Sequence, residues 1–196
     1  SAAWADGALQ IGFHSVGPAG LGEGVLRPRR LRAGSDGVVI SAEERLVGPE
    51  TRVLSASVAT GATVTAVAWI DTRTGAAVPV FGTVVGGNQY LPEELLGGPN
   101  GMAGSLDLAA ADDTFGVVWE DSGAVWFQLL GVLGTRAPRL NLREVGAPLT
   151  AGPVIAATAG RFGVAWAQGD TVRFRELSLG GQPLGEDAAP YGAGGA

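Results

Sequence analysis

A six-residue segment recurs near every fiftieth position of this 196-residue chain. Residues 114–119 read Thr-Phe-Gly-Val-Val-Trp, and residues 161–166, which lie 47 positions later, read Arg-Phe-Gly-Val-Ala-Trp. A looser copy ends at Trp69, and a shortened one ends at Trp4. Repetition with a period of about 40 to 50 residues is typical of a fold built from small similar units. We therefore divide the chain, as a single repeat domain, into units at roughly residues 1–50 (irregular), 51–99, 100–148 and 149–196.

Each unit is predicted to consist of β-strands. The 33 glycines and 11 prolines divide the sequence into short runs rich in Val, Ala, Phe, Trp and Thr, and sustained helical periodicity is hard to find. In the last unit these runs predict strands at residues 153–158, 162–167, 171–177 and 182–185. The unit before it has the same layout, with predicted strands at residues 105–110, 114–120, 124–130 and about 139–142.

The second strand of a unit is predicted to be covered on both faces. Phe115, Val117 and Trp119 point to one face of the strand, Gly116 and Val118 point to the other, and neither set is polar. Small antiparallel sheets packed face to face around an axis have this profile. The prediction is an all-β, β-propeller-like fold of about four four-stranded antiparallel blades, either a four-bladed ring or half of a larger propeller. The repeated tryptophans are expected in its core: Trp4, Trp69, Trp119 and Trp166.

The first unit departs from the repeat. Trp4 and Trp69 are 65 positions apart, which is 15 to 18 more than the other intervals. Residues 37–41 either add a strand there or are the remnant of a degenerate fifth unit. An arginine-rich run at residues 27–32 lies in the same stretch. It is interpreted as a solvated edge strand, with a local anion site as the alternative.

The last unit combines three short motifs: Phe-Gly-Val-Ala-Trp at residues 162–166, Val-Arg-Phe at residues 172–174, and Gly-Gln-Pro-Leu-Gly at residues 181–185. Together they resemble the repeats of bacterial exported β-propeller proteins. The resemblance covers about residues 51–185 well and the first 50 poorly, and the Ser-x-Asp-x-Gly-x-Thr-Trp box of sialidases is missing. It implies the fold and an extracellular or cell-surface location more than any one activity.

Composition argues against several kinds of function. The net charge of −6 argues against general electrostatic binding of nucleic acid. The chain has no cysteine, so disulfides, thiolate catalysis and cysteine-bound zinc are excluded, and its one histidine, His14, has no partner at metal-ligand or triad spacing. No run approaches the roughly 18 apolar residues of a membrane-spanning helix. We expect no cofactor, no metal, no catalytic residue and no membrane insertion.

The candidate binding residues follow the second strands or lie on a third strand. Asp71 and Arg73 follow one second strand, and Glu120 and Asp121 end the next, so these residues would ring one end of a propeller as a shallow cation or sugar site. The favoured interpretation is that such residues simply form tight hairpins. Trp126 stands where the last unit has an arginine, which makes it a candidate exposed contact, although packing between blades is favoured.

The expected function is a non-catalytic binding or scaffolding module, exported or at the cell surface, that presents propeller loops to a protein or glycan. One alternative is a glycosidase- or lyase-type enzyme in which carboxylates from different blades meet at the central channel. A second alternative is a structural half-propeller that is completed by a second chain, as in a homodimer.

Overall fold

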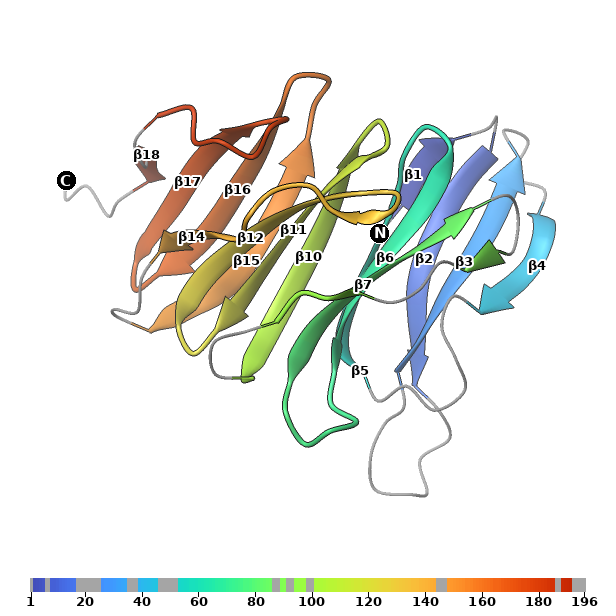
Figure 1. Ribbon diagram of the computed structural model, residues 1–196, viewed down its shortest axis with the longest axis horizontal. Helices are drawn as coiled ribbons and strands as arrows, with labels where there is room; N and C mark the ends of the chain where they lie inside the picture. The colour runs from blue at the N-terminus through green and yellow to red at the C-terminus, as the bar shows by residue number, and fades with distance from the viewer. Residues whose placement is uncertain are drawn as a thin grey trace.

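The structure is a computed structural model, and it describes residues 2–5, 8–16, 26–34, 39–45, 53–85, 89–90, 94–97, 101–143, 148–185 and 188–191. All regular elements among these residues are β-strands, and they form four antiparallel sheets. The sheets follow one another in chain order, with the first and last at opposite ends of the row (Figure 1). The prediction of an all-β fold built from small antiparallel sheets is confirmed for the described residues.

The first two sheets are built from the first half of the chain. Sheet 1 contains β1 (Ala2–Ala5), β2 (Ala8–Val16), β3 (Leu26–Gly34) and β4 (Val39–Arg45) in that order. Sheet 2 contains β5 (Val53–Thr60), β6 (Val64–Asp71) and β7 (Val78–Val85), with the short strands β8 (Gln89–Tyr90) and β9 (Glu94–Leu95) both paired to β7. Strand β5 contacts β1, β2 and β3 of sheet 1.

The second half of the chain forms two more antiparallel sheets, each from consecutive strands. Sheet 3 contains β10 (Ala103–Ala111), β11 (Thr114–Asp121) and β12 (Ala124–Gly131), with β13 (Gly134–Thr135) and β14 (Leu140–Arg143) both paired to β12. Sheet 4 contains β15 (Leu149–Ala157), β16 (Arg161–Gln168), β17 (Thr171–Ser178) and β18 (Ala188–Tyr191) in that order. Strand β10 contacts both β5 and β15, so the first strands of sheets 2, 3 and 4 are neighbours.

Two strand assignments made from the sequence are wrong. The outer strand of sheet 4 is β18, not residues 182–185, of which Pro183 makes only an isolated bridge with Leu177. The N–H of Ser178 donates to the Gln182 carbonyl (2.8 Å) and the N–H of Leu184 to the Glu176 carbonyl (2.9 Å), so this segment closes the turn at the end of β17 and goes no further along it. The arginine-rich run does lie in a strand, β3, but this strand is paired on both sides, with β2 and β4, and is not an edge. Residues 39–41 begin β4, which supports the added-strand interpretation, whereas residues 37 and 38 lie outside the described residues.

Two apolar cores fill the spaces between successive sheets. The core between sheets 2 and 3 includes Phe81 from one side and Phe115 and Trp119 from the other. The core between sheets 3 and 4 includes Val118 from one side and Phe162, Val164 and Trp166 from the other. Val118 and Trp119 are neighbours in β11, and both are 0% exposed. The predicted burial of the second strand on both faces is therefore confirmed for sheet 3.

The repeated tryptophans whose side chains the structure describes are all buried. Trp69 and Trp119 are 0% exposed and Trp166 is 2% exposed, so their predicted place in the core is confirmed. The side chain of Trp4 lies outside the described residues. The indole nitrogens of Trp69, Trp119 and Trp166 have no hydrogen-bond partner in the described part of the chain. Their contribution to stability therefore comes from burial and packing.

A glycine and pairs of phenylalanines set the distance between sheets. The ring centroids of Phe127 and Phe162, on sheets 3 and 4, are 6.0 Å apart, with their planes tilted by 55°. Phe81 and Phe115, on sheets 2 and 3, are related in the same way at 5.8 Å and 52°. A β-carbon at Gly116 would lie 2.8 Å from Cδ1 of Ile155 and 2.9 Å from Cε2 of Phe127. A glycine at this place lets sheet 4 approach sheet 3 closely.

Two carboxylates on sheet 3 bind its neighbours. On β10, Oδ1 of Asp107 accepts a hydrogen bond from the Ser57 hydroxyl (2.9 Å) and Oδ2 accepts one from the Ile155 backbone N–H (3.0 Å). In the turn after β10, Asp113 accepts hydrogen bonds from the N–H (2.8 Å) and hydroxyl (2.6 Å) of Thr63. Asp107 therefore joins sheet 3 to sheets 2 and 4, and Asp113 joins it to the β5–β6 turn.

The hydrogen bonds to Asp113 lower its pKa. Burial by itself raises the pKa of this carboxyl group, but the hydrogen bonds from Thr63 and from the backbone N–H groups of Val64 and Ala62 outweigh burial. The net result is a pKa below the usual value for aspartate. The carboxylate is therefore favoured in the folded state, where it connects the turns of sheets 2 and 3.

Replacing Trp119 tests how the sheets are held together. Trp119→Ala is expected to lower the free energy of unfolding by roughly 3–5 kcal/mol, because it leaves a large cavity between sheets 2 and 3. Trp119→Phe is expected to cost only roughly 1–2 kcal/mol, because it keeps an aromatic ring and the indole N–H makes no hydrogen bond that could be lost. Urea denaturation followed by circular dichroism measures both, and equal losses would contradict this account.

Replacing Asp113 tests the connection between turns as a function of pH. The folded-state pKa lies below the unfolded one, so the carboxylate stabilises the fold above the unfolded-state pKa of about 4, and this stabilisation is lost as pH falls through the folded-state value. Asp113→Asn is therefore expected to be less stable than the wild type at neutral pH, with the difference shrinking below about pH 4. Urea denaturation at several pH values measures the difference, and a difference independent of pH would contradict the proposed ionisation.

Candidate binding cleft

The pair Asp71 and Arg73 shapes the hairpin between β6 and β7. Oδ1 of Asp71 accepts a hydrogen bond from the Arg73 backbone N–H (2.9 Å). Oδ2 of Asp71 accepts a hydrogen bond from Nε of Arg73 (2.6 Å) and forms an ion pair with Nη2 of the same side chain. The Asp71 residue is only 7% exposed, whereas the Arg73 side chain is 41% exposed. The carboxylate is thus engaged in forming the turn, and ligand binding by this pair stays a prediction.

Glu120 and Asp121 occupy opposite sides of the end of β11. Asp121 is 0% exposed and accepts a hydrogen bond from the Ser122 hydroxyl (3.0 Å). Glu120 is half-buried, and its Oε1 accepts a hydrogen bond from the Gly123 N–H (2.7 Å). Ser122 and Gly123 both have positive φ angles, 54° and 83°, as a tight two-residue hairpin turn requires. Both carboxylates therefore support the β11–β12 turn, but only Glu120 is accessible.

Glu120 lines an open cleft of about 600 Å³ between sheets 3 and 4. Three parts of the chain form this cleft: the start of β10, the turn after β11, and the start of β15 together with the residues before it. Ser105, Ser122 and Thr150 contribute hydroxyl groups, and Leu149 contributes an apolar surface. Glu120 is the only one of the five predicted binding residues among those that line the cleft.

Two glycines open the cleft. A β-carbon at Gly104 would lie 2.5 Å from Oε2 of Glu120, and one at Gly152 would overlap the hydroxyl of Ser105. Both glycines lie at register shifts near the start of a first strand, in β10 and in β15. Neither glycine is among the binding residues predicted from the sequence, although an isolated glycine in a strand pattern is a known signal for a bulge or a close approach. The two glycines lie 48 positions apart, each near the start of a first strand. This repetition is the sequence signal that could have indicated the cleft.

Trp126 lies in a packed environment away from the cleft lining. It is half-buried, packs against the core between sheets 2 and 3, and is paired with Trp119 on the neighbouring strand. The guanidinium carbon of Arg139 lies 4.6 Å from its ring centroid, and Nη1 of Arg139 donates a hydrogen bond to the carbonyl of Gly97 (2.8 Å). This geometry agrees with the favoured interpretation of packing between sheets. A role for Trp126 as an exposed contact stays a prediction.

The part of the chain that the structure describes contains neither a candidate metal site nor a candidate membrane helix. Within it, no three histidine, aspartate or glutamate side chains lie close enough together to hold a metal ion. No helix long and apolar enough to cross a membrane occurs among the same residues. The polar groups that line the cleft are one carboxylate, several hydroxyls and backbone amides.

No protein-family model matches this chain, and no curated protein matches it. Solved structures do. A Trypanosoma rangeli sialidase in complex with 2,3-difluorosialic acid matches with a TM-score of 0.57 and 11% identity, over 94% of this chain and 37% of its own. A prolyl endopeptidase matches with a TM-score of 0.52 and 15% identity, over 94% and 26%. A nidogen/laminin complex reaches a TM-score of 0.49 at 15% identity, over 90% and 61%.

The sialidase and the prolyl endopeptidase are β-propeller-type proteins. At 11 to 15% identity the likeness shows the fold alone. The chain spans between about a quarter and three fifths of the length of these structures. The arrangement of its sheets is therefore propeller-like, whereas binding and catalysis both remain compatible with the comparison.

Replacing Trp126 tests whether it packs or binds. Trp126→Ala is expected to lower the free energy of unfolding by roughly 2 kcal/mol, less than the loss for a fully buried tryptophan. Arg139→Ala is expected to cost only about 0.5–1 kcal/mol, the value of a cation–π contact at an exposed site. Urea denaturation measures both, and an unchanged stability of Trp126→Ala would instead favour the exposed-contact interpretation.

Proposed function

We propose that this chain is a non-catalytic binding module of the β-propeller type, and that its cleft beside Glu120 holds a protein segment carrying a basic side chain. The single observation that carries the proposal is the cleft itself. It is open, it lies where two sheets and three turns or strand ends meet, and one of the predicted binding residues lines it.

The chemistry of the cleft favours a cationic segment. Oε1 of Glu120 is held by the Gly123 N–H, which fixes the direction of the carboxylate and leaves Oε2 over Gly104 without a hydrogen-bond donor in the described part of the chain. A carboxylate forms strong charge-assisted hydrogen bonds with arginine and lysine. The net charge of −6 attracts a basic partner at long range. Leu149 offers an apolar surface beside the carboxylate.

The positions of the carboxylates favour binding over glycoside hydrolysis. That reaction normally needs two carboxyl groups facing one substrate. Among the described lining residues of the cleft, Glu120 is the only carboxylate. On the neighbouring first strands β5, β10 and β15 the only carboxylate is Asp107, and both of its oxygens already accept hydrogen bonds within the protein.

The proposal includes the number of blades and the place of action. The four sheets correspond to four propeller blades, and the chain works outside the cell or on its surface. The regular stacking of sheets 2, 3 and 4 supports the first point. The resemblance of residues 162–185 to exported propeller repeats supports the second.

An array of peptides with and without arginine or lysine tests the ligand class. The wild-type chain is expected to bind basic peptides selectively, and Glu120→Gln is expected to weaken that binding by about tenfold or more, because one charge-assisted hydrogen bond is worth about 1.5–3 kcal/mol. Asp170→Asn removes an equal charge at an exposed site outside the cleft lining and is expected to bind like the wild type. Equal weakening by both substitutions would show that only net charge matters.

A glycan array serves as the opposing test. Selective glycan binding that Glu120→Gln abolishes, with no peptide binding, would overturn the protein segment as ligand. Turnover of a glycan by the wild-type chain would overturn the non-catalytic assignment. Both variants are first compared with the wild type by circular dichroism, because a change in folding would remove binding for an unrelated reason.

A further inference from the structure

The face of sheet 4 that points away from sheet 3 is apolar. Side chains of β16 alternate between the two faces of the sheet, and Phe162, Val164 and Trp166 belong to the core shared with sheet 3. The residues between them, and those that pair with them on β15 and β17, therefore point the other way. We name this surface the outer face, and its main residues are Val154, Gly163, Ala165, Ala167, Val172 and Phe174.

The same repeat positions in sheet 3 form a buried interface. Val125 and Phe127 lie 47 positions before Val172 and Phe174, and they are 0% and 1% exposed because sheet 4 covers them. Val172, by contrast, is 40% exposed, and Val154 on the neighbouring strand β15 is 56% exposed. The outer face of sheet 4 is thus equivalent to the faces of sheets 2 and 3 that pack against the next sheet.

Phe174 occupies the same repeat position in sheet 4 as Phe81 in sheet 2 and Phe127 in sheet 3, the two phenylalanines that contact the next sheet. Phe81 on β7 and Phe127 on β12 each meet a phenylalanine ring of the following sheet, at 5.8 and 6.0 Å. Phe174 on β17 pairs with Ala165, as Phe127 pairs with Val118. A β-carbon at Gly163 would lie 3.0 Å from Cε2 of Phe174, so the ring lies over this glycine. No second ring meets Phe174 in the described part of the chain.

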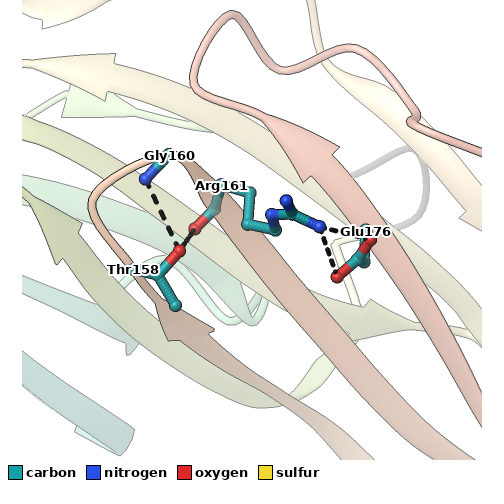
Figure 2. A network of polar contacts seen from close by, with 4 residues as sticks. All are labelled: Thr158, Gly160, Arg161 and Glu176. Carbon is teal, nitrogen blue, oxygen red and sulfur yellow. Dashed lines mark hydrogen bonds and ion pairs between the residues drawn. The ribbon is translucent and has the colours of Figure 1, made fainter.

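The charged residues of the outer face are paired with each other. Nη1 of Arg161 donates hydrogen bonds to Oε1 (3.1 Å) and Oε2 (3.0 Å) of Glu176 across the strands β16 and β17 (Figure 2). The backbone carbonyl of Arg161 also accepts a hydrogen bond from the Thr158 N–H (2.9 Å), which closes the β15–β16 turn next to it. One positive and one negative side chain in contact leave the described outer face with no net charge.

We propose that a second copy of this chain docks on the outer face, about a twofold axis that brings the two Phe174 rings together. A twofold contact uses the same patch on both molecules, so the patch must complement itself. In each internal interface the next sheet contributes a second phenylalanine ring. At the outer face, Phe174 of the second copy contributes that ring. The small residues Ala165 and Ala167 along the central strand leave room for the opposing ring, and a neutral face meets its copy without repulsion between like charges.

This inference goes beyond the proposed function and is independent of it. The cleft opens at the turn after β11 and at the start of β15, and its charged residue, Glu120, belongs to sheet 3. The outer face is centred on β16 and β17 of sheet 4. Loss of dimerisation would leave peptide binding at the cleft to be judged by its own experiment, and the reverse also holds.

Sedimentation velocity of the full chain over a hundredfold range of concentration tests the contact. The wild type is expected to form a species of twice 19.7 kDa at the upper concentrations. Phe174→Glu and Val154→Glu are each expected to return the mass to 19.7 kDa, because each places a charge inside an apolar interface. Leu133→Glu, at a position 93% exposed in the turn after β12, and Glu120→Gln are expected to keep the dimer.

Chemical cross-linking gives a second, independent measurement. The chain contains no cysteine, so a single Val172→Cys substitution provides one defined attachment point while Phe174 is kept. A short bismaleimide reagent is expected to join two Val172→Cys chains but not two Leu133→Cys chains. A wild type that stays monomeric throughout, a mass that rises beyond the dimer, or a dimer that survives both glutamate substitutions would overturn the twofold contact.

Discussion

Face-to-face packing of thin apolar sheets is the constraint on which the rest of this structure depends. The middle strand of sheet 3 is buried on both sides, so residues 115–119 can carry no charged group at a reasonable cost in free energy. Polar groups are therefore displaced to the ends of the strands, where turn residues such as Ser122 and Gly123 reach solvent. The spacing between sheets is narrow enough to require Gly116 beneath the rings of Phe127 and Phe162. Packing thus decides where chemistry is possible.

The sequence predicts the repeated strands of sheets 3 and 4 well, because burial on both faces leaves a dense local pattern. The predicted strands at residues 114–120, 124–130 and 171–177 lie within β11, β12 and β17. The tryptophan at the end of each second strand marks the unit, and its burial follows from the alternation of side chains along the strand. Outer strands are harder to predict, since they bury little and their composition is less restricted. Residues 182–185 are predicted as the outer strand of their unit, but β18 takes that place in the sheet.

The cleft was only partly predictable, because its shape depends on contacts between residues distant in the sequence. Glu120 could be chosen from its position at the end of a strand, but its neighbours Ser105 and Thr150 come from other elements. Gly104 and Gly152 matter only through the side chains that lie over them, which no local pattern reports. The environment of Trp126 likewise depends on Arg139, a residue 13 positions further along the chain that covers the ring from another strand connection. Three-dimensional neighbours, not residue type, decide these roles.

Asp107 has a consequence for how the sheets lose their structure. In most repeat proteins each unit touches only the units beside it, so stability is close to a sum of single-unit and nearest-neighbour terms, and terminal units can fray separately. Here one carboxylate on β10 accepts hydrogen bonds from Ser57 before it and Ile155 after it. Displacement of either Ser57 or Ile155 removes a hydrogen bond from the same Asp107 carboxylate. The free energy of unfolding sheet 2 is therefore linked to that of sheet 4. We therefore expect the three sheets to lose their structure together rather than as a row of independently melting modules.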